Sequence, residues 1–280
     1  MLHPKIANVS ATRHILKTFN LRASKKLGQN FLIDAGVVEE IVNAAEISAG
    51  DEVLEIGPGI GTLTQGLLES GAKVTAVELD KKLPPVLAQT LAGYENFKLV
   101  QGDILKVDVE KLMPPNFKVV ANLPYYITTQ ILLTLMEKKL PITKIVTMVQ
   151  REVAERMTAA PNSKTYGAMS VAVQFRADVH IAFDVPPESF LPRPEVKSSV
   201  VVCDIKEPSF KVDENFFTRV VRASFGQRRK TLLNSLIGAG FNRESVAKAL
   251  ESAGIEINRR AETLSIEDFV RLTNSLKSKI

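Results

Sequence analysis

The sequence holds 280 residues, 45% hydrophobic and 24% charged, which is long enough for one large globular domain and a small one. No apolar run approaches the roughly 18 residues that would span a membrane. The single cysteine, Cys203, excludes a disulfide framework and indicates a reducing cytoplasm. The three histidines are scattered and share no metal-binding spacing with Cys203, so no metal site is predicted.

Basic residues gather in two segments that contain no acidic residue. Residues 1–33 and 215–243 each carry six Lys or Arg, whereas the rest of the chain, with 24 basic and 31 acidic residues, carries −7. Such segregation is typical of a protein that binds a polyanion, most often nucleic acid, although a solvated basic face has the same composition. The predicted RNA contacts are Arg22, Lys25, Lys26, Arg222, Arg228, Arg229 and Lys230.

Strand and helix patterns alternate over the first 157 residues. Short apolar runs predict buried strands at residues 53–56, 73–78, 97–101, 117–121 and 142–149. Helical spacing is found at residues 35–45, 62–70, 80–91, 128–138 and 151–157. This alternation predicts a parallel, doubly wound sheet covered by helices on both faces.

The pattern changes in the second half of the chain. Alternating apolar residues over 169–183 and 196–205 predict two further strands and an antiparallel edge, so the sheet has seven strands. Beyond Pro208 only helical patterns remain, and Ser265–Asp268 resembles a capping box that opens the last helix. We therefore predict an α/β domain over residues 1–206 and a small helical, RNA-binding domain over residues 207–280.

A glycine loop follows the first predicted strand. Gly57, Gly59 and Gly61 allow the backbone to approach a ligand closely. A nicotinamide site would carry the pattern G-x-G-x-x-G, but the third glycine here comes one residue early. The loop therefore favours an adenosine cofactor other than NAD.

Three carboxylates accompany this loop at strand ends. Glu78 is placed to accept hydrogen bonds from the ribose hydroxyls, Asp103 from an adenine amino group, and Glu55 lies just before the glycines. Several carboxylates would repel a pyrophosphate but would attract a sulfonium and an α-ammonium group. The cofactor predicted from these residues is S-adenosylmethionine.

A polar and aromatic motif, Asn122-Leu123-Pro124-Tyr125, follows the fourth predicted strand. The N6 amine of adenine is a poor nucleophile because its lone pair is delocalised into the ring. The oxygen of Asn122 and a backbone carbonyl held beside Pro124 can accept its hydrogens and return electron density to nitrogen. Tyr125 can stack on a base that has left its helix. The motif thus predicts methyl transfer to an exocyclic base amine, with no histidine acting as a base.

Eight motifs, in order along nearly the whole chain, give a family resemblance. They are residues 28–32, residues 55–61, Glu78, residues 102–103, 122–125, 150–154, 190–196 and 225–230. Together they resemble the ribosomal RNA adenine N6,N6-dimethyltransferase family, in its kasugamycin-sensitivity small-subunit branch. The resemblance implies a Rossmann-like class I methyltransferase. It also implies a monomer that dimethylates two adjacent adenines in a hairpin near the 3′ end of small-subunit rRNA on an assembling particle.

The same resemblance assigns roles to individual residues. It implies cofactor contacts at Asn30, Leu32, Gly57, Glu78, Asp103 and Asn122. It implies target-base contacts at Asn122, Leu123 and Tyr125, with Phe190 as a second stacking ring. Two alternatives stay open, because relatives that methylate large-subunit RNA share the motifs, and because a non-catalytic assembly or RNA-binding factor would keep the basic segments.

Overall fold

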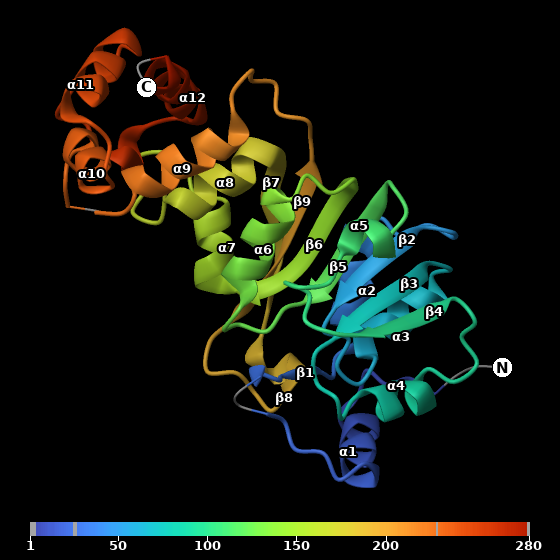
Figure 1. Ribbon diagram of the computed structural model, residues 1–280. Helices are drawn as coiled ribbons and strands as arrows, with labels where there is room; N and C mark the ends of the chain where they lie inside the picture. Colours follow the sequence, from blue (N-terminus) through green and yellow to red (C-terminus); the bar gives the residue numbers. More distant parts are fainter. Residues whose placement is uncertain (1–3, 25–26, 228, 279–280) are drawn as a thin grey trace. The chain divides into compact units, whose positions relative to one another are not determined.

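Seven strands form one sheet, in the order β4-β3-β2-β5-β6-β9-β7 (Figure 1). Neighbouring strands from β4 to β6 run parallel, and β9 pairs antiparallel with β6. The strands are β2 (Glu52–Ile56), β3 (Lys73–Glu78), β4 (Phe97–Gln101), β5 (Phe117–Asn122), β6 (Ile142–Gln150), β7 (Ala177–Val185) and β9 (Ser198–Ile205). The predicted seven-stranded, mostly parallel sheet is confirmed.

Helices cover both faces of this sheet, which explains why its central strands are continuous apolar runs. In Figure 1, α2 and α3 lie on one face, and α5 and α6 on the other. The helices before residue 158 are α1 (Val9–Thr18), α2 (Ala35–Ala44), α3 (Thr62–Glu69), α4 (Pro84–Thr90), α5 (Val109–Leu112), α6 (Thr128–Glu137) and α7 (Arg151–Met157). α4 begins later than the predicted residue 80 because proline, which lacks an N–H, suits the first helical position.

The computed structural model describes residues 4–24, 27–227 and 229–278. It divides into two compact units: Met1–Ala154 with Val179–Ile205, and Glu155–Asp178 with Lys206–Ile280. Residues 155–178 thus group with the C-terminal helices, whereas the sequence interpretation assigned them to the first domain. No helix in these described ranges is long and apolar enough to cross a membrane.

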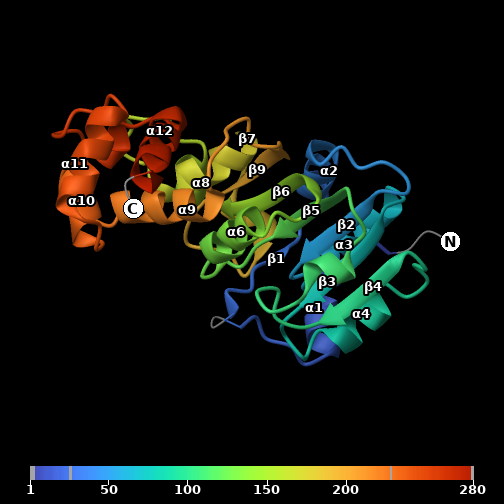
Figure 2. The same cartoon turned by 45° about the horizontal axis from the view of Figure 1, so that its top comes forward.

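The second unit is helical. Its helices are α8 (Ala168–Arg176), α9 (Glu214–Ser224), α10 (Leu232–Gly238), α11 (Arg243–Ser252), the 3-10 turn η3 (Ala261–Thr263) and α12 (Ile266–Lys277). α9 to α12 gather in one cluster in both views (Figures 1 and 2). The predicted capping box is confirmed, since Ser265 Oγ accepts from the Asp268 N–H and an Asp268 oxygen accepts from the Ser265 N–H, both at 3.1 Å.

One predicted strand was wrong over half of its length. Residues 169–183 were expected to be extended, but α8 occupies residues 168–176 and β7 begins only at Ala177. The helix is buried on several sides, and Phe175 stacks on Phe217 with ring centroids 4.4 Å apart. A helix covered on more than one side loses its 3.6-residue apolar period, so its sequence can imitate the alternation of a strand.

A two-stranded ribbon joins segments far apart in the sequence. β1 (Phe31–Leu32) pairs antiparallel with β8 (Phe190–Leu191), with Phe31 opposite Leu191 and Leu32 opposite Phe190. The 3-10 turn η2 (Pro187–Ser189) precedes β8. Since Phe31, Leu32 and Phe190 belong to the main hydrophobic core, the ribbon fixes the N-terminal segment to the first unit.

Candidate active site

A cavity opens at the carboxyl ends of the parallel strands. Its walls include Gly57 after β2, Glu78 at the end of β3, Asp103 after β4 and Asn122 at the end of β5. The space measures about 1020 Å³, part of it open to solvent. Open α/β sheets bind ligands at this edge. The strand order therefore brings together four predicted site residues that are distant in the sequence.

The glycine loop that borders the cavity has a backbone conformation that favours glycine. Gly57, Gly59 and Gly61 have φ values of +71°, +61° and +93°. A Cβ added at Gly57 would meet no atom within 4 Å, so the loop leaves open space there. Gly59 lines the cavity, but Gly61 is absent from its described lining, and a Cβ at Gly61 would lie 3.2 Å from Leu91. Gly61 therefore serves the packing of the loop against the end of α4.

Two buried carboxylates lie on the cavity wall. Glu78 is 6% exposed and accepts from the backbone N–H groups of Asp80 at 2.7 Å and Gly59 at 3.3 Å. Burial raises its pKa, because a low dielectric disfavours the charged form. Glu55 is 1% exposed, and its Oε2 has no hydrogen-bond partner among the described residues. Burial, together with the nearby charge of Glu78, raises the pKa of Glu55 to about 8.

The motif at the end of β5 is fixed by hydrogen bonds at each of its residues. Asn122 Nδ2 donates to the Asn30 carbonyl at 3.3 Å, which commits the donor end of the amide and leaves its oxygen to accept. The buried Leu123 donates its N–H to the Met148 carbonyl at 3.3 Å. The Pro124 carbonyl accepts from Thr128 Oγ1 at 2.9 Å, and Tyr125 Oη lies 2.6 Å from Ser198 Oγ. All four motif residues line the cavity.

Residues 20–278 match the family described as ribosomal RNA adenine dimethylase. The chain belongs to the ribosomal RNA adenine dimethylase family. Its relatives include proteins named ribosomal RNA small subunit methyltransferase A. That of Clostridioides difficile (strain 630) is 45% identical over 99% of this chain and 98% of its own, and that of Ligilactobacillus salivarius (strain UCC118) is 47% identical over 98% and 96%. The predicted family, and with it the class of enzyme, is confirmed.

Two solved structures share this fold. A dimethyladenosine transferase from Plasmodium falciparum superposes with a TM-score of 0.75 and 28% identity, over 89% of this chain and 98% of that one. The 23S rRNA methyltransferase ErmE superposes with a TM-score of 0.67 and 26% identity, over 89% and 100%. The Rossmann-like methyltransferase fold of this adenine dimethylase is therefore confirmed.

The cavity of this adenine dimethylase fits S-adenosylmethionine, the cofactor of such methyltransferases. The loop at Gly57 leaves space for a ligand beside the backbone, and Glu55 has a buried oxygen without a partner. An ammonium or sulfonium group beside Glu55 would favour the ionised form of this carboxyl and lower its raised pKa. Glu78 is held at the end of β3, where it can accept from ribose hydroxyls. Among the described residues, no group of three or more His, Cys, Asp or Glu gathers as metal ligands.

The N-terminal segment of the dimethylase closes one side of the cavity. Asn30 and Leu32, both predicted cofactor contacts, line it. Gln29 Nε2 donates to Asp80 at 2.9 Å, and Asn30 Nδ2 donates to the Gly28 carbonyl at 3.2 Å. The first bond fastens the segment to the turn after β3, and the second holds the segment's own turn. The two predicted contacts thus come from a segment outside the main sheet.

The large apolar residues that line the cavity are not all the predicted ones. Phe190, predicted as the second stacking ring, is 1% exposed and packs in the core, outside the described cavity lining. Tyr126, which follows the motif directly, lines the cavity and is 56% exposed. Leu79, which follows Glu78, also lines it and is 46% exposed. The sequence interpretation included neither residue, although each directly follows a predicted site residue, Tyr125 or Glu78.

The predicted RNA contacts divide between the two units. Arg22 is exposed in the first unit, and Arg222, Arg229 and Lys230 are exposed in the second. Lys25, Lys26 and Arg228 lie outside the described residues. Arg222 is in the last turn of α9, and Arg229 and Lys230 lie in the connection to α10.

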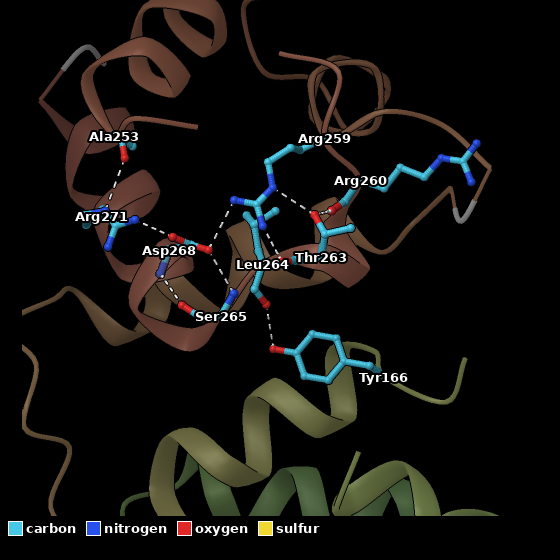
Figure 3. A network of polar contacts seen from close by, with 9 residues as sticks. All are labelled: Tyr166, Ala253, Arg259, Arg260, Thr263, Leu264, Ser265, Asp268 and Arg271. Atoms are coloured by element: carbon cyan, nitrogen blue, oxygen red, sulfur yellow. Dashed lines mark hydrogen bonds and ion pairs between the residues drawn. The ribbon is translucent and has the colours of Figure 1, made fainter. Parts of the chain in front are cut away.

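A polar network surrounds Asp268 within the helical unit (Figure 3). The Leu232 N–H at the start of α10 donates to the Arg259 carbonyl at 2.8 Å. The guanidinium of Arg259 lies 3.5 Å from Asp268, which also pairs with Arg271. Tyr166 Oη donates to the Leu264 carbonyl at 3.0 Å on the same segment. Asp268, only 14% exposed, thus joins two guanidinium groups and the cap of α12.

Proposed function

We propose that this chain transfers methyl groups from S-adenosylmethionine to N6 of two adjacent adenines in a hairpin near the 3′ end of small-subunit rRNA, during assembly of the subunit. The observation that carries the proposal is a single cavity. Its wall includes the glycine loop, Glu78 and Asp103, and also the motif from Asn122 to Tyr125. The names of the relatives, ribosomal RNA small subunit methyltransferase A, favour the small-subunit RNA as substrate.

In this mechanism the protein mainly positions the reacting groups and provides acceptors. When bound, S-adenosylmethionine supplies an electrophilic methyl group on a sulfonium. The Asn122 oxygen accepts a hydrogen bond from the adenine N6 amine, which increases the electron density on that nitrogen as it attacks the methyl group. The methylated nitrogen then loses a proton to water, and a neutral thioether is left. Tyr125 stacks on the extruded base. The Pro124 carbonyl already accepts hydrogen bonds from Thr128 and Ile127. We therefore assign the second acceptor of the amine to the Leu123 carbonyl, which belongs to the peptide bond just before the Pro124 ring.

We assign the binding of RNA phosphates to exposed basic residues outside the cavity. Arg22 serves the first unit, and Arg222, Arg229 and Lys230 serve the helical unit. Cationic side chains that neutralise phosphates release counterions, and this makes binding depend on salt. The enzyme is further proposed to act as a monomer in the cytoplasm, and a light-scattering mass near 30.8 kDa in solution would support the monomer.

The test offers the purified chain and S-adenosylmethionine three substrates: small subunits that lack the modification, free small-subunit RNA and large subunits. Nucleoside mass spectrometry then identifies the product. Dimethyladenosine on the small-subunit particle is the expected result. Product on large-subunit RNA alone would show that the substrate is large-subunit RNA. Cofactor binding without product would favour a non-catalytic assembly factor.

A further inference from the structure

A buried serine reaches the phenol of Tyr125. Ser198 Oγ lies 2.6 Å from Tyr125 Oη, and Ser198 is 0% exposed. Ser198 is the first residue of β9 and lies opposite Gln150, the last residue of β6. Because β9 runs antiparallel to β6, its start lies at the edge of the sheet where β5 and β6 end. Topology alone therefore brings this hydroxyl to the motif.

The neighbouring residue provides an internal comparison. Ser199 is also 0% exposed, yet its hydroxyl donates to Asp184 at 2.7 Å. Successive side chains of a strand point to opposite faces, so only one of the two serines can reach Tyr125. The two serines share exposure, strand and residue type, and differ in their partner.

Tyr125 is held at both ends of its side chain. At the backbone, the Pro124 carbonyl accepts from the Ile127 N–H at 3.2 Å and from Thr128 Oγ1 at 2.9 Å, which closes the turn. At the far end, Ser198 holds the phenol. Burial raises the pKa of Tyr125, so the hydroxyl stays protonated and can keep this bond. A ring tied at both ends has little freedom to rotate.

We propose that Ser198 is a positioning residue, which sets the plane of the Tyr125 ring against the target adenine. This role rests on the proposed function. The direction in which N6 points at the methyl group depends on how the base stacks, and small misalignments slow transfer strongly. Ser198 touches neither the cofactor nor the base in this scheme, so its loss should change turnover and leave cofactor affinity intact.

The experiment compares S198A, S199A, Y125F and the double variant S198A/Y125F, with small subunits as substrate. We expect S198A and Y125F each to lower kcat about tenfold, which is the fold-change that corresponds to the free energy of one buried hydrogen bond. The double variant should have a kcat no lower than that of either single variant, because both substitutions remove the same bond. The dissociation constant of S-adenosylmethionine should stay within about twofold of the wild-type value, and S199A should keep the wild-type kcat. The fraction of monomethyladenosine should rise, because a slower second transfer competes with release of the RNA.

Several outcomes would overturn the positioning role. They are an S198A variant with the kcat of S199A, effects of S198A and Y125F that multiply, or equal losses of kcat and cofactor affinity. If S198A fails to fold, Y125F removes the same bond from the other side, and a kcat within about twofold of wild type then rejects the proposal. A wild-type chain that methylates no adenine would overturn the proposed function itself, which is a separate result.

Discussion

Replacement of Glu55 by Gln should change how the stability of the protein depends on pH. Burial raises the pKa of Glu55 from its usual 4.5 to about 8 in the folded chain. Below the pKa that Glu55 has in the unfolded chain, this side chain is protonated in both the folded and the unfolded protein, so its burial takes nothing from the free energy of unfolding. As pH rises toward 8, the unfolded state ionises first, and stability falls. At about 1.4 kcal/mol per pKa unit, the loss is on the order of 5 kcal/mol across this window, and it stops above the folded pKa.

The assay is urea unfolding of the cofactor-free protein, followed by circular dichroism at closely spaced pH values. The Glu55→Gln variant should lose most of the decline that the wild type shows between about pH 5 and pH 8. Glu40→Gln, which changes an exposed carboxylate on α2, is the control and should follow the wild type. A Glu55→Gln variant whose stability falls as steeply as that of the wild type would refute the assignment of a buried, protonated carboxyl to this position.

Three further predictions concern the motif, the helical unit and RNA binding. Asn122→Ala should lower kcat by about 10²–10³-fold, the effect of deleting one preorganised polar contact, while calorimetry still detects cofactor binding; near-normal methylation would reject its role. Asp268→Ala should destabilise the helical unit by about 2–3 kcal/mol, because two guanidinium groups and a helix cap lose their partner. Thermal unfolding measures this, with the exposed neighbour Glu267→Ala as control, and equal losses in both variants would contradict it. Lys230→Ala should reduce the slope of log binding constant against log salt by about one, and an unchanged slope would remove Lys230 from the phosphate contacts.

Much of the first unit could be predicted because each signal is local. Parallel strands buried on both faces appear as short apolar runs, and residues at their carboxyl ends must share one edge of the sheet. Gly57, Glu78, Asp103 and Asn122 were placed in one site on this basis, and the structure brings them together. The capping box before α12 is equally local, since two side chains and two N–H groups within four residues define it.

The rest depended on packing that a single sequence does not display. The 3.6-residue period of α8 is obscured because the helix is buried on several sides. Gly61 belongs to the same glycine pattern as Gly57, yet only the position of Leu91 shows that it serves helix packing. Phe190 is buried because β8 pairs with β1, a contact between segments more than 150 residues apart. Likewise, the bond between Tyr125 and Ser198 follows from an antiparallel register that no local pattern contains.

The distribution of charge explains why the cavity and the proposed RNA contacts are separate. Glu55 and Glu78 are buried at the cavity wall, where a cationic cofactor would favour their ionised forms, and the carboxylates so formed would repel a phosphate. A nucleotide can therefore present its neutral base to Asn122 and Tyr125 only if its phosphates stay outside. The exposed cations Arg22, in the first unit, and Lys230, in the second, are outside the cavity lining among the described residues and suit that task. An extruded base with its backbone held elsewhere is the arrangement that this division of charge favours.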